Sequence, residues 1–305
     1  MIAVFRKFFT SALVTAALIG TPAGARPAFA IAEGEGVADG AYRFSVLLTM
    51  TALPADGGGT RDSSCSGALV APRWVITAGH CFRTPDGRNV SRLVAARTTA
   101  TIGRADLDSA DGHEVDVVAV RQAANADVAL AELGAPITDI TPLRIGTTPP
   151  TAGETVRLTG YGLTSDTDSA TTRRLQTGQF VVDRVGDSLL ETSGRAPSRE
   201  TSPCLHDSGG PYFTERPGEA PVLVAVVSSG PGCPHTGHDF SARTDNLSGW
   251  INDTISERDA GPPDRRLVGA GLAVLVVALL AASLAVLALR RDVPTAARRP
   301  RWRRP

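Results

Sequence analysis

Short apolar runs separated by turn-forming residues dominate the middle of this 305-residue sequence. Each run is rich in Val, Leu, Ile or Thr and has the length and composition of a β-strand. The runs are residues 44–50, 68–70, 74–77, 98–102, 115–120, 128–133, 155–159, 179–182 and 222–227. Stretches rich in Gly, Pro and Asp, such as 56–59 and 85–87, lie between them and are typical of loops. We therefore expect an all-β barrel or sandwich.

Helical periodicity is found after the strand-rich segment, at residues 247–255. The apolar side chains of its one face are Leu247, Trp250, Ile251 and Ile255. This spacing predicts one C-terminal helix. The proline-containing stretch 141–150 predicts a crossing between two halves of the domain.

The first thirty residues have the organisation of a secretory signal. Arg6 and Lys7 precede an apolar run over 8–19, and residues 28–30 (Ala-Phe-Ala) fit the signal-peptidase rule. The apolar run is shorter than the roughly 20 residues that span a bilayer. We expect residues 1–30 to be removed, with cleavage after Ala25 as the alternative.

An uncharged stretch of Leu, Val, Ala and Gly over residues 267–289 is long enough to cross a membrane. A buried core helix is the alternative, but one of that length normally carries a polar face. Residues 290–305 hold seven arginines and one acid. The positive-inside rule predicts that such a tail stays in the cytoplasm. The alternative interpretation is that the tail contacts anionic lipid or nucleic acid. We expect a single-pass cell-membrane protein whose domain at 31–255 is extracellular, on a stalk at 256–266.

The formal charge of the whole chain is zero, but the exported part is acidic. Residues 31–266 contain 21 arginines and 30 acids, a net charge near −9. This balance argues against a nucleic-acid binder. Lys7 is the only lysine, while Arg and Ala abound, which suggests a GC-rich coding genome and an actinobacterium-like bacterial source.

Three short motifs carry residue types used in nucleophilic catalysis. His80 leaves the end of a predicted strand in Thr-Ala-Gly-His-Cys, Asp127 directly precedes the apolar run 128–133, and Ser208 lies in Asp-Ser-Gly-Gly-Pro. Each motif alone is weak, because most histidines are structural and most loop acids are solvated. The glycines that follow Ser208 have no side chain, so a ligand can approach the backbone closely there.

Taken together, in the order His, Asp, Ser, these motifs resemble the trypsin/chymotrypsin-like serine peptidases. The likeness runs from about residue 31 to 255 and includes Gly-Tyr-Gly at 160–162 and Ser-Ser-Gly at 228–230 before Cys233. The resemblance implies an all-β fold of two six-stranded antiparallel barrels, at about 31–145 and 146–250, with the site in the cleft between them. The C-terminal helix and one transmembrane helix would complete the chain.

The resemblance also implies the roles of the three residues. Ser208 would be the nucleophile, His80 the general base that takes its proton, and Asp127 the acid that holds the imidazole. The expected function is a serine endopeptidase for extracellular proteins or peptides, monomeric and without a cofactor. A catalytically impaired, membrane-displayed binding module is the alternative. An esterase on another scaffold fits less well, because the Gly-x-Ser-x-Gly elbow and the order Ser, Asp, His are not found.

Four cysteines lie in the exported part, where disulfides form. Four cysteines permit three pairings, and their spacing does not choose among them. The resemblance implies Cys65 with Cys81 and Cys204 with Cys233.

An activation ion pair is the next expectation from the resemblance. Ile31 directly follows the Ala-Phe-Ala site and aligns with the amino terminus that folds inward in this family. Asp207, which precedes Ser208, would be its partner. Signal peptidase would then create the active terminus, although Ala32 and Glu33 depart from the family pattern; the alternative is that Ile31 only marks the cleavage site.

His206 is a further departure from the family pattern. The oxyanion hole is expected to use the backbone N–H groups of His206 and Ser208, and the family has glycine at the position of His206. A turn that requires a positive φ suits glycine better than histidine. An impaired oxyanion hole is therefore one expectation for this chain.

The specificity pocket is expected to include Ser202, six residues before Ser208, with Ser228 and Gly230 on one wall. A serine in place of an acid at that position favours an apolar or small substrate side chain. Asp239, on the far strand of the pocket, is the complication, since an acid inside would restore a basic preference.

Two groups of residues have spacings that resemble metal sites, but structural roles explain both groups better. Cys233, His235 and His238 have loose metal-ligand spacing, but Cys233 is expected in a disulfide. The acids Asp106, Asp108, Asp111 and Glu114 resemble a calcium loop, yet their spacing is one residue off the EF-hand pattern. We expect no metal.

Overall fold

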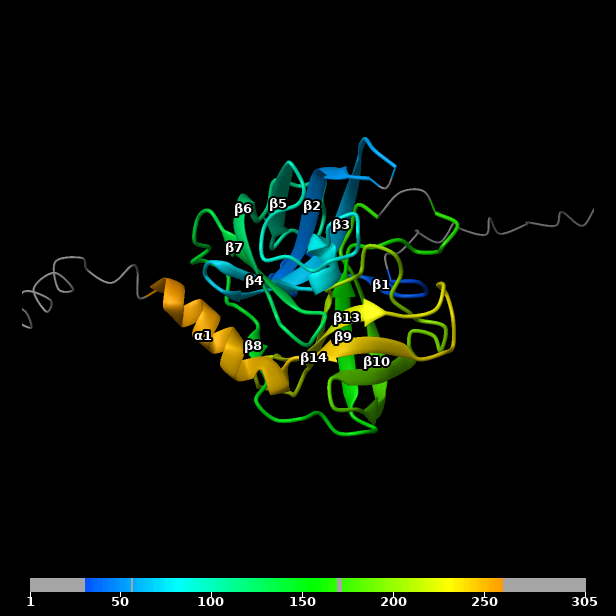
Figure 1. Cartoon of the computed structure of the whole chain (residues 1–305). Helices are drawn as coiled ribbons and strands as arrows, with labels where there is room; N and C mark the ends of the chain where they lie inside the picture. The colour runs from blue at the N-terminus through cyan, green and yellow to red at the C-terminus, as the bar shows by residue number, and fades with distance from the viewer. Residues whose placement is uncertain (1–30, 56, 169–171, 260–305) are drawn as a thin grey trace, which may run out of the picture.

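The computed structural model describes residues 31–55, 57–168 and 172–259, which form two β-barrels and a helix (Figure 1). The predicted signal at 1–30, the predicted span at 267–289 and the basic tail at 290–305 lie outside the described residues. No helix among the described residues combines the length and apolar character that crossing a bilayer requires.

Six strands close the first barrel in the order β2-β3-β4-β7-β6-β5. They are β2 (Ser45–Pro54), β3 (Thr60–Ala71), β4 (Trp74–Thr77), β5 (Arg97–Ile102), β6 (His113–Gln122) and β7 (Ala129–Leu133). Along β2 the side chains of Val46, Leu48 and Met50 are buried and alternate with less buried ones. This period of two places one face of the strand in the barrel core.

The second barrel is built from β9 (Thr155–Gly160), β10 (Gln176–Val185), β11 (Leu189–Ala196), β12 (Pro211–Thr214), β13 (Val222–Ser229) and β14 (Asp239–Arg243). Its strands pair in the order β10-β11-β14-β13-β12-β9, and the pairing of β9 with β10 closes the ring. Two short strands extend the sheet. β1 (Glu35–Gly36) pairs with β10, and β8 (Arg144–Ile145) pairs in parallel with β13.

The C-terminal helix α1 (Ser248–Asp259) follows a 3₁₀ turn at Asp245–Leu247. Ile251 is fully buried, and Leu247, Trp250 and Ile255 pack against the largest apolar cluster. That cluster contains side chains of both barrels. The helix therefore fastens the end of the second barrel to the body of the molecule, and Figure 1 shows it lying along one side.

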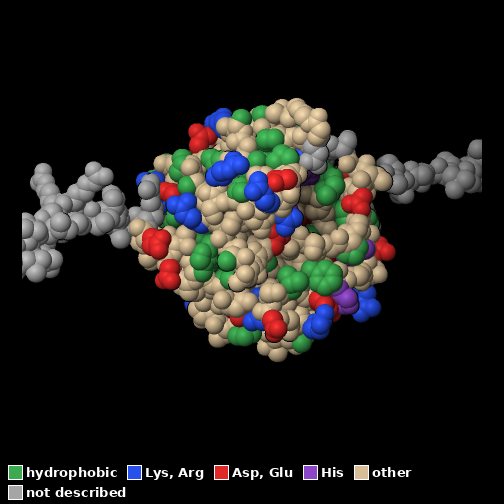
Figure 2. All heavy atoms as spheres, in the orientation of Figure 1, with side chains coloured by type: hydrophobic (Ala, Val, Ile, Leu, Met, Phe, Trp, Pro, Cys, Tyr) green, Lys and Arg blue, Asp and Glu red, His purple; other side chains and the backbone are tan. Residues whose placement is uncertain are grey.

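The predicted fold of two six-stranded barrels with a C-terminal helix is confirmed. Three strands of the second barrel, β11, β12 and β14, were not predicted from the sequence. On the face shown in Figure 2, arginine side chains are interspersed with Asp and Glu rather than segregated from them.

Candidate active site

His80 and Asp127 meet because the strands that precede and follow them are paired. β4 ends at Thr77 and β7 begins at Ala129, and these two residues are partners in the antiparallel register. His80 lies three residues after Thr77, on the 3₁₀ turn Gly79–Phe82, and Asp127 lies two residues before Ala129. Both side chains therefore emerge at the same edge of the first barrel.

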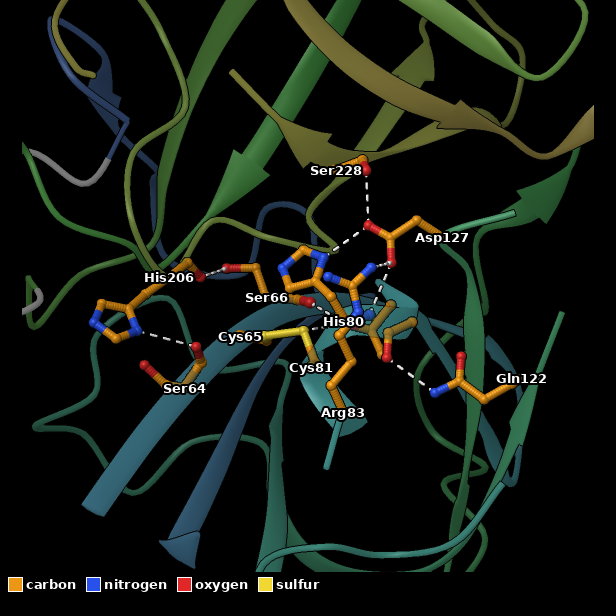
Figure 3. The surroundings of a disulfide bond; sticks show 12 residues. Ser64, Cys65, Ser66, His80, Cys81, Arg83, Gln122, Asp127, His206 and Ser228 are labelled. Carbon is orange, nitrogen blue, oxygen red and sulfur yellow. Dashed lines mark hydrogen bonds and ion pairs between the residues drawn. A yellow bond between two sulfur atoms is a disulfide. The ribbon is translucent and has the colours of Figure 1, made fainter. Parts of the chain in front are cut away.

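Asp127 accepts three hydrogen bonds that fix its orientation (Figure 3). Its Oδ2 lies 2.7 Å from Nδ1 of His80 and accepts a 2.7 Å bond from Oγ of Ser228, and its Oδ1 accepts a 2.8 Å bond from the backbone N–H of His80. Because a carboxylate only accepts, Nδ1 of His80 carries the proton. In the neutral ring, the other nitrogen, Nε2, carries a lone pair and can act as a base.

The pKa of Asp127 is lowered from its ordinary value. Burial alone would raise it, but the hydrogen bond and charge interaction with His80, together with the bond from Ser228, outweigh burial. Arg83 adds a more distant positive charge, with its guanidinium 3.9 Å from Oδ1. Asp127 is therefore ionised at neutral pH, and its negative charge lies against the His80 ring.

Ser208 lies on a turn that is held by both barrels. Its carbonyl oxygen accepts a 2.9 Å hydrogen bond from the backbone of Ser66 on β3, and the next residue, Gly209, donates a 2.8 Å bond to Val227 on β13. Ser208 and His80 line the same cavity of about 540 Å³. The structure thus brings the three expected catalytic residues to one place.

His206 adopts the left-handed conformation, with a φ of 76°. Three contacts hold it there. Its ring Nδ1 donates to the carbonyl of Ser64 at 3.0 Å, its own carbonyl accepts from Oγ of Ser66 at 3.1 Å, and the preceding carbonyl, of Leu205, accepts from the N–H of Leu163 at 2.8 Å. Figure 3 shows the ring turned toward Ser64.

The bond from Leu163 also orients the N–H of His206. In a trans peptide the C=O and N–H point in opposite directions, so the N–H of His206 points away from Leu163. Among the described residues, no acceptor binds this N–H or that of Ser208. Two backbone donors are therefore available beside Ser208.

Asp207 is fully buried between the amino-terminal segment and the second barrel. Its carboxylate accepts hydrogen bonds from the backbone N–H groups of Gly162 at 2.8 Å, Cys204 at 3.0 Å and Ile31. A Cβ atom on Gly162 would lie 2.6 Å from Oδ2 of Asp207, so only glycine leaves room for the carboxylate. This close approach explains the second glycine of the Gly-Tyr-Gly sequence at 160–162.

Ile31 and Asp207, the expected ion pair, are thus in contact in the structure. The Ile31 side chain is fully buried in the second-barrel core. Burial raises the pKa of Asp207 to about 7, although the three N–H donors lower it in part. These donors are neutral, so a positive charge at Ile31 would stabilise the ionised carboxylate further.

Both disulfides that the resemblance implied are present. Cys65–Cys81 joins β3 to the turn that carries His80, and Cys204–Cys233 joins the loop before Ser208 to the loop after β13. Each disulfide therefore anchors one functional loop.

A second cavity, of about 450 Å³, opens on the other side of Ser208. Ser228 and Gly230 lie on its wall, as expected, and Asp239 also lines it. Ser202 is fully buried and is not among the described residues that line this cavity. Its hydroxyl instead donates to the carbonyl of Glu200 at 3.2 Å and accepts from the N–H of His235 at 3.3 Å.

Four residues of the two metal sites considered from the sequence have other partners. Asp106 and Asp108 pair with Arg174 and Arg173, and His238 pairs with Asp183 at 3.0 Å. Cys233 is in its disulfide. Neither set is gathered into a common ligand shell.

Sequence reasoning missed several residues that support the site. Ser228 was placed on the pocket wall without its hydrogen bond to Asp127. Gln122 donates to the carbonyl of Gly79 at 2.9 Å and so holds the His80 turn, and Ser66 contacts both His206 and Ser208. Their positions depend on strand pairing, and no local sequence pattern indicated these contacts.

Comparisons with known proteins agree with this geometry. The profile of the family described as Trypsin matches residues 31–251. A trypsin-like protease of Streptomyces glaucescens is 32% identical over 57% of this chain and 67% of its own length. Serine protease 56 of Mus musculus is 26% identical over 77% of this chain and 40% of its own length. Transmembrane protease serine 9 of Rattus norvegicus is 27% identical over 65% of this chain and 20% of its own length. The chain thus spans less than half the length of these two mammalian relatives.

Proposed function

Because this chain belongs to the trypsin family of serine proteases, we propose that it is a serine endopeptidase that cleaves extracellular proteins or peptides. The observation that carries the proposal is the chain of hydrogen bonds from Ser228 through Asp127 to His80, next to the cavity that His80 shares with Ser208. We also propose that the whole protein acts on protein or peptide substrates and is monomeric.

In the proposed mechanism, Oγ of Ser208 attacks the scissile carbonyl carbon while Nε2 of His80 takes the hydroxyl proton. Asp127, already ionised, stabilises the imidazolium that forms. The N–H groups of His206 and Ser208 donate to the developing oxyanion. His80 then returns the proton to the leaving amine, and an ester between Ser208 and the acyl group remains. Water, activated by His80, hydrolyses this ester and regenerates Ser208.

The amino terminus is part of the same proposal. Cleavage after Ala30 would give Ile31 a positively charged amine in place of its amide N–H. The contact between Ile31 and Asp207 supports this step, because a buried carboxylate is tolerated when it is paired and hydrogen bonded. No separate activating protease is then required.

Membrane attachment is also proposed, on sequence features that lie outside the described residues except at 256–259, which form the end of α1 rather than the start of a separate stalk. Residues 1–30 would direct export, 256–266 would form a stalk, 267–289 would span the cell membrane, and 290–305 would stay in the cytoplasm. A bacterial, actinobacterium-like source is proposed on the arginine-rich, lysine-poor composition and the Streptomyces relative.

A fluorophosphonate probe tests the proposed chemistry, because it forms a bond from phosphorus to an activated serine oxygen with loss of fluoride. The wild-type chain is expected to be labelled at Ser208. His80→Ala and Asp127→Asn are expected to slow labelling by several orders of magnitude. Ser188→Ala, at an exposed position between β10 and β11, is the matched control and should be labelled like the wild type.

Failure of a folded, processed chain to be labelled would contradict the catalytic proposal. It would favour the alternative function, a membrane-displayed binding module. His206 and the loosely matched amino terminus were the grounds for that alternative. The φ of 76° at His206 supports the catalytic proposal, because a residue in this conformation can present its N–H as glycine does.

A further inference from the structure

The cavity that His80 shares with Ser208 has a basic lining. Arg61 and Arg83 both contribute to it, and neither Asp nor Glu is among the described residues that line it. Residues 31–266 as a whole carry 30 acids and 21 arginines, so a positive lining is the reverse of the charge balance of this part of the chain. The positive charge of the cavity is therefore a local feature of these two side chains.

The register of β3 turns Arg61 toward the cavity. Side chains alternate along a strand, and Arg61 shares its face with Ser63 and Cys65, which also line the cavity. The neighbouring acid, Asp62, does not line it, and its Oδ1 accepts a 2.9 Å hydrogen bond from the backbone N–H of Ala52. Among the described residues, no acid pairs with the guanidinium of Arg61. Its charge is therefore available to a ligand.

Arg83 directly follows the 3₁₀ turn of the first barrel, and its guanidinium is fixed in place. Its Nε donates a 2.8 Å hydrogen bond to Oδ1 of Asn89. Its Nη2 lies 3.9 Å from Oδ1 of Asp127, an ion pair drawn in Figure 3. The nearby acid Asp86 is already paired with Arg88 at 2.6 Å. A guanidinium has five N–H donors and this side chain is 47% exposed, so Arg83 can still donate to a ligand in the cavity.

The proposed mechanism identifies which part of a substrate enters this cavity. His80 returns its proton to the leaving amine, so the leaving group lies on the side of Ser208 that His80 occupies. His80 and Ser208 both line this cavity, whereas the described lining of the 450 Å³ cavity includes Ser208 without His80. Two extended residues span about 7 Å, the scale of a cavity of about 540 Å³. The first two residues after the scissile bond therefore pass along the basic lining.

We propose that this cavity is a leaving-group subsite selective for an acidic side chain, Glu or Asp, at the first or second residue after the scissile bond. This inference rests on the proposed function of Ser208. A carboxylate there meets two guanidinium groups, each able to offer paired N–H donors, and no acid among the described residues of the wall. Because both arginines are exposed, the preference is about 5- to 10-fold and is screened by salt.

Peptide substrates that differ only in Glu or Gln provide the first test, because this pair keeps the size of the side chain and removes its charge. The exchange is made at each of the first two leaving-group positions of a peptide that the processed full chain cleaves. In dilute buffer, kcat/KM should be about 5- to 10-fold higher for Glu at one of these positions. At about 1 M salt, where charges more than roughly 3 Å apart are screened, the two values should converge.

Variants of Arg61 assign the preference to the cavity. Arg61→Gln should reduce the ratio of the Glu to the Gln value at least about twofold, and Arg61→Lys, which keeps the charge, should retain most of it. Arg195→Gln, at an exposed position on β11 outside both cavities, is the matched control and should keep the wild-type ratio. A Glu preference that survives both Arg61→Gln and high salt is not electrostatic and overturns the inference.

Binding of the same peptides to Ser208→Ala, measured by calorimetry, provides the second test without any reaction. The Glu peptide should bind about 5- to 10-fold more tightly than the Gln peptide. Equal cleavage of the two peptides at both positions by a chain that is labelled at Ser208 overturns the inference and leaves the proposed function standing. Selective binding of the Glu peptide by a chain that hydrolyses no peptide and takes no fluorophosphonate instead refutes the proposed function and leaves the acid-binding cavity standing.

Discussion

The backbone of His206 decides whether the proposed oxyanion hole can form. A histidine with a φ of 76° is strained, at a cost of about 1–3 kcal/mol in such regions. The hydrogen bonds to Ser64 and from Ser66 offset part of that cost, since each contributes about 1 kcal/mol. The departure from glycine is thus compensated locally by two serines of β3.

Substitutions at this position should separate conformation from side-chain chemistry. His206→Asn is expected to keep fluorophosphonate labelling within a few-fold, because Asn tolerates the left-handed region. His206→Val should slow labelling by about 10²- to 10³-fold, because a β-branched residue disfavours this φ and one oxyanion donor is lost. Second-order labelling rates measure both. A valine variant that is labelled as fast as the wild type would show that this N–H is not used.

Asp239 should make stability depend on pH. Burial first, and then the charge of Asp207, raise the pKa of Asp239 from 3.8 to about 8. The folded chain therefore keeps a proton on Asp239 up to about pH 8, whereas the unfolded chain loses it near pH 4. Since the folded state binds the extra proton, the free energy of unfolding falls as pH rises through this window.

Asp239→Asn lacks this titration, so its stability relative to the wild type should increase between pH 4 and pH 8, by about 2–4 kcal/mol. Asp207, Asp166 and His235 also face this region, but they are present in both proteins and their contributions largely cancel in the difference. Urea unfolding of both proteins at pH 4, 6 and 8 checks this. If the difference between the two proteins is independent of pH, Asp239 is not buried as an unpaired carboxyl.

At the scale of single residues, local motifs predicted which side chains gather at the site, but not all of their contacts. His80, Asp127 and Ser208 stand in short patterns that can be read along the chain. The bond from Ser228 to Asp127 joins residues that are 101 positions apart, and it depends on how the barrels pack. Ser202 and Asp239 show the same limit, because only the register of β14 decides which of the two lines the cavity.

At the scale of elements, the apolar strands of the first barrel were predictable and the polar strands of the second were not. β14 has the sequence Asp-Phe-Ser-Ala-Arg, and its inward residues Asp239 and Ser241 are polar. β11 carries Glu191, Thr192 and Ser193, and β12 has only four residues. Strands with polar residues on the inward face lack the apolar alternation that identifies a strand. Length alone does not decide this, because β4 also has four residues and was predicted.

The pairing of strands also explains why the contact between His80 and Asp127 could be predicted only from the family resemblance. The two apolar runs at 74–77 and 128–133 were both predicted as strands, and each lies next to one of these residues. Their antiparallel pairing is a long-range contact between β4 and β7, which the pattern of either strand leaves open. The helix α1 was easier, since its period of 3.6 is local.

At the scale of the whole molecule, the site depends on segments from both barrels and from the amino terminus. β3 binds the carbonyl of Ser208, β13 binds the next residue, and Ile31 reaches the carboxylate of Asp207 from the other end of the chain. Asp207 therefore connects the position of the amino terminus to the conformation of the Ser208 turn. In the proposed function, the charge on residue 31 would therefore influence the activity of Ser208.

Insertion of one glycine between Ala30 and Ile31 should test this connection. The added residue leaves an amide at Ile31 and moves the amine away from Asp207, so the buried carboxylate keeps only neutral donors. Breaking a buried pair costs about 3–5 kcal/mol, and labelling of Ser208 should slow at least about 100-fold. Phe29→Leu, which leaves the mature chain unchanged, should have no effect. Terminal sequencing must find Ile31 first in the active protein; full labelling of a chain that begins at Arg26 would show that no such pair is needed.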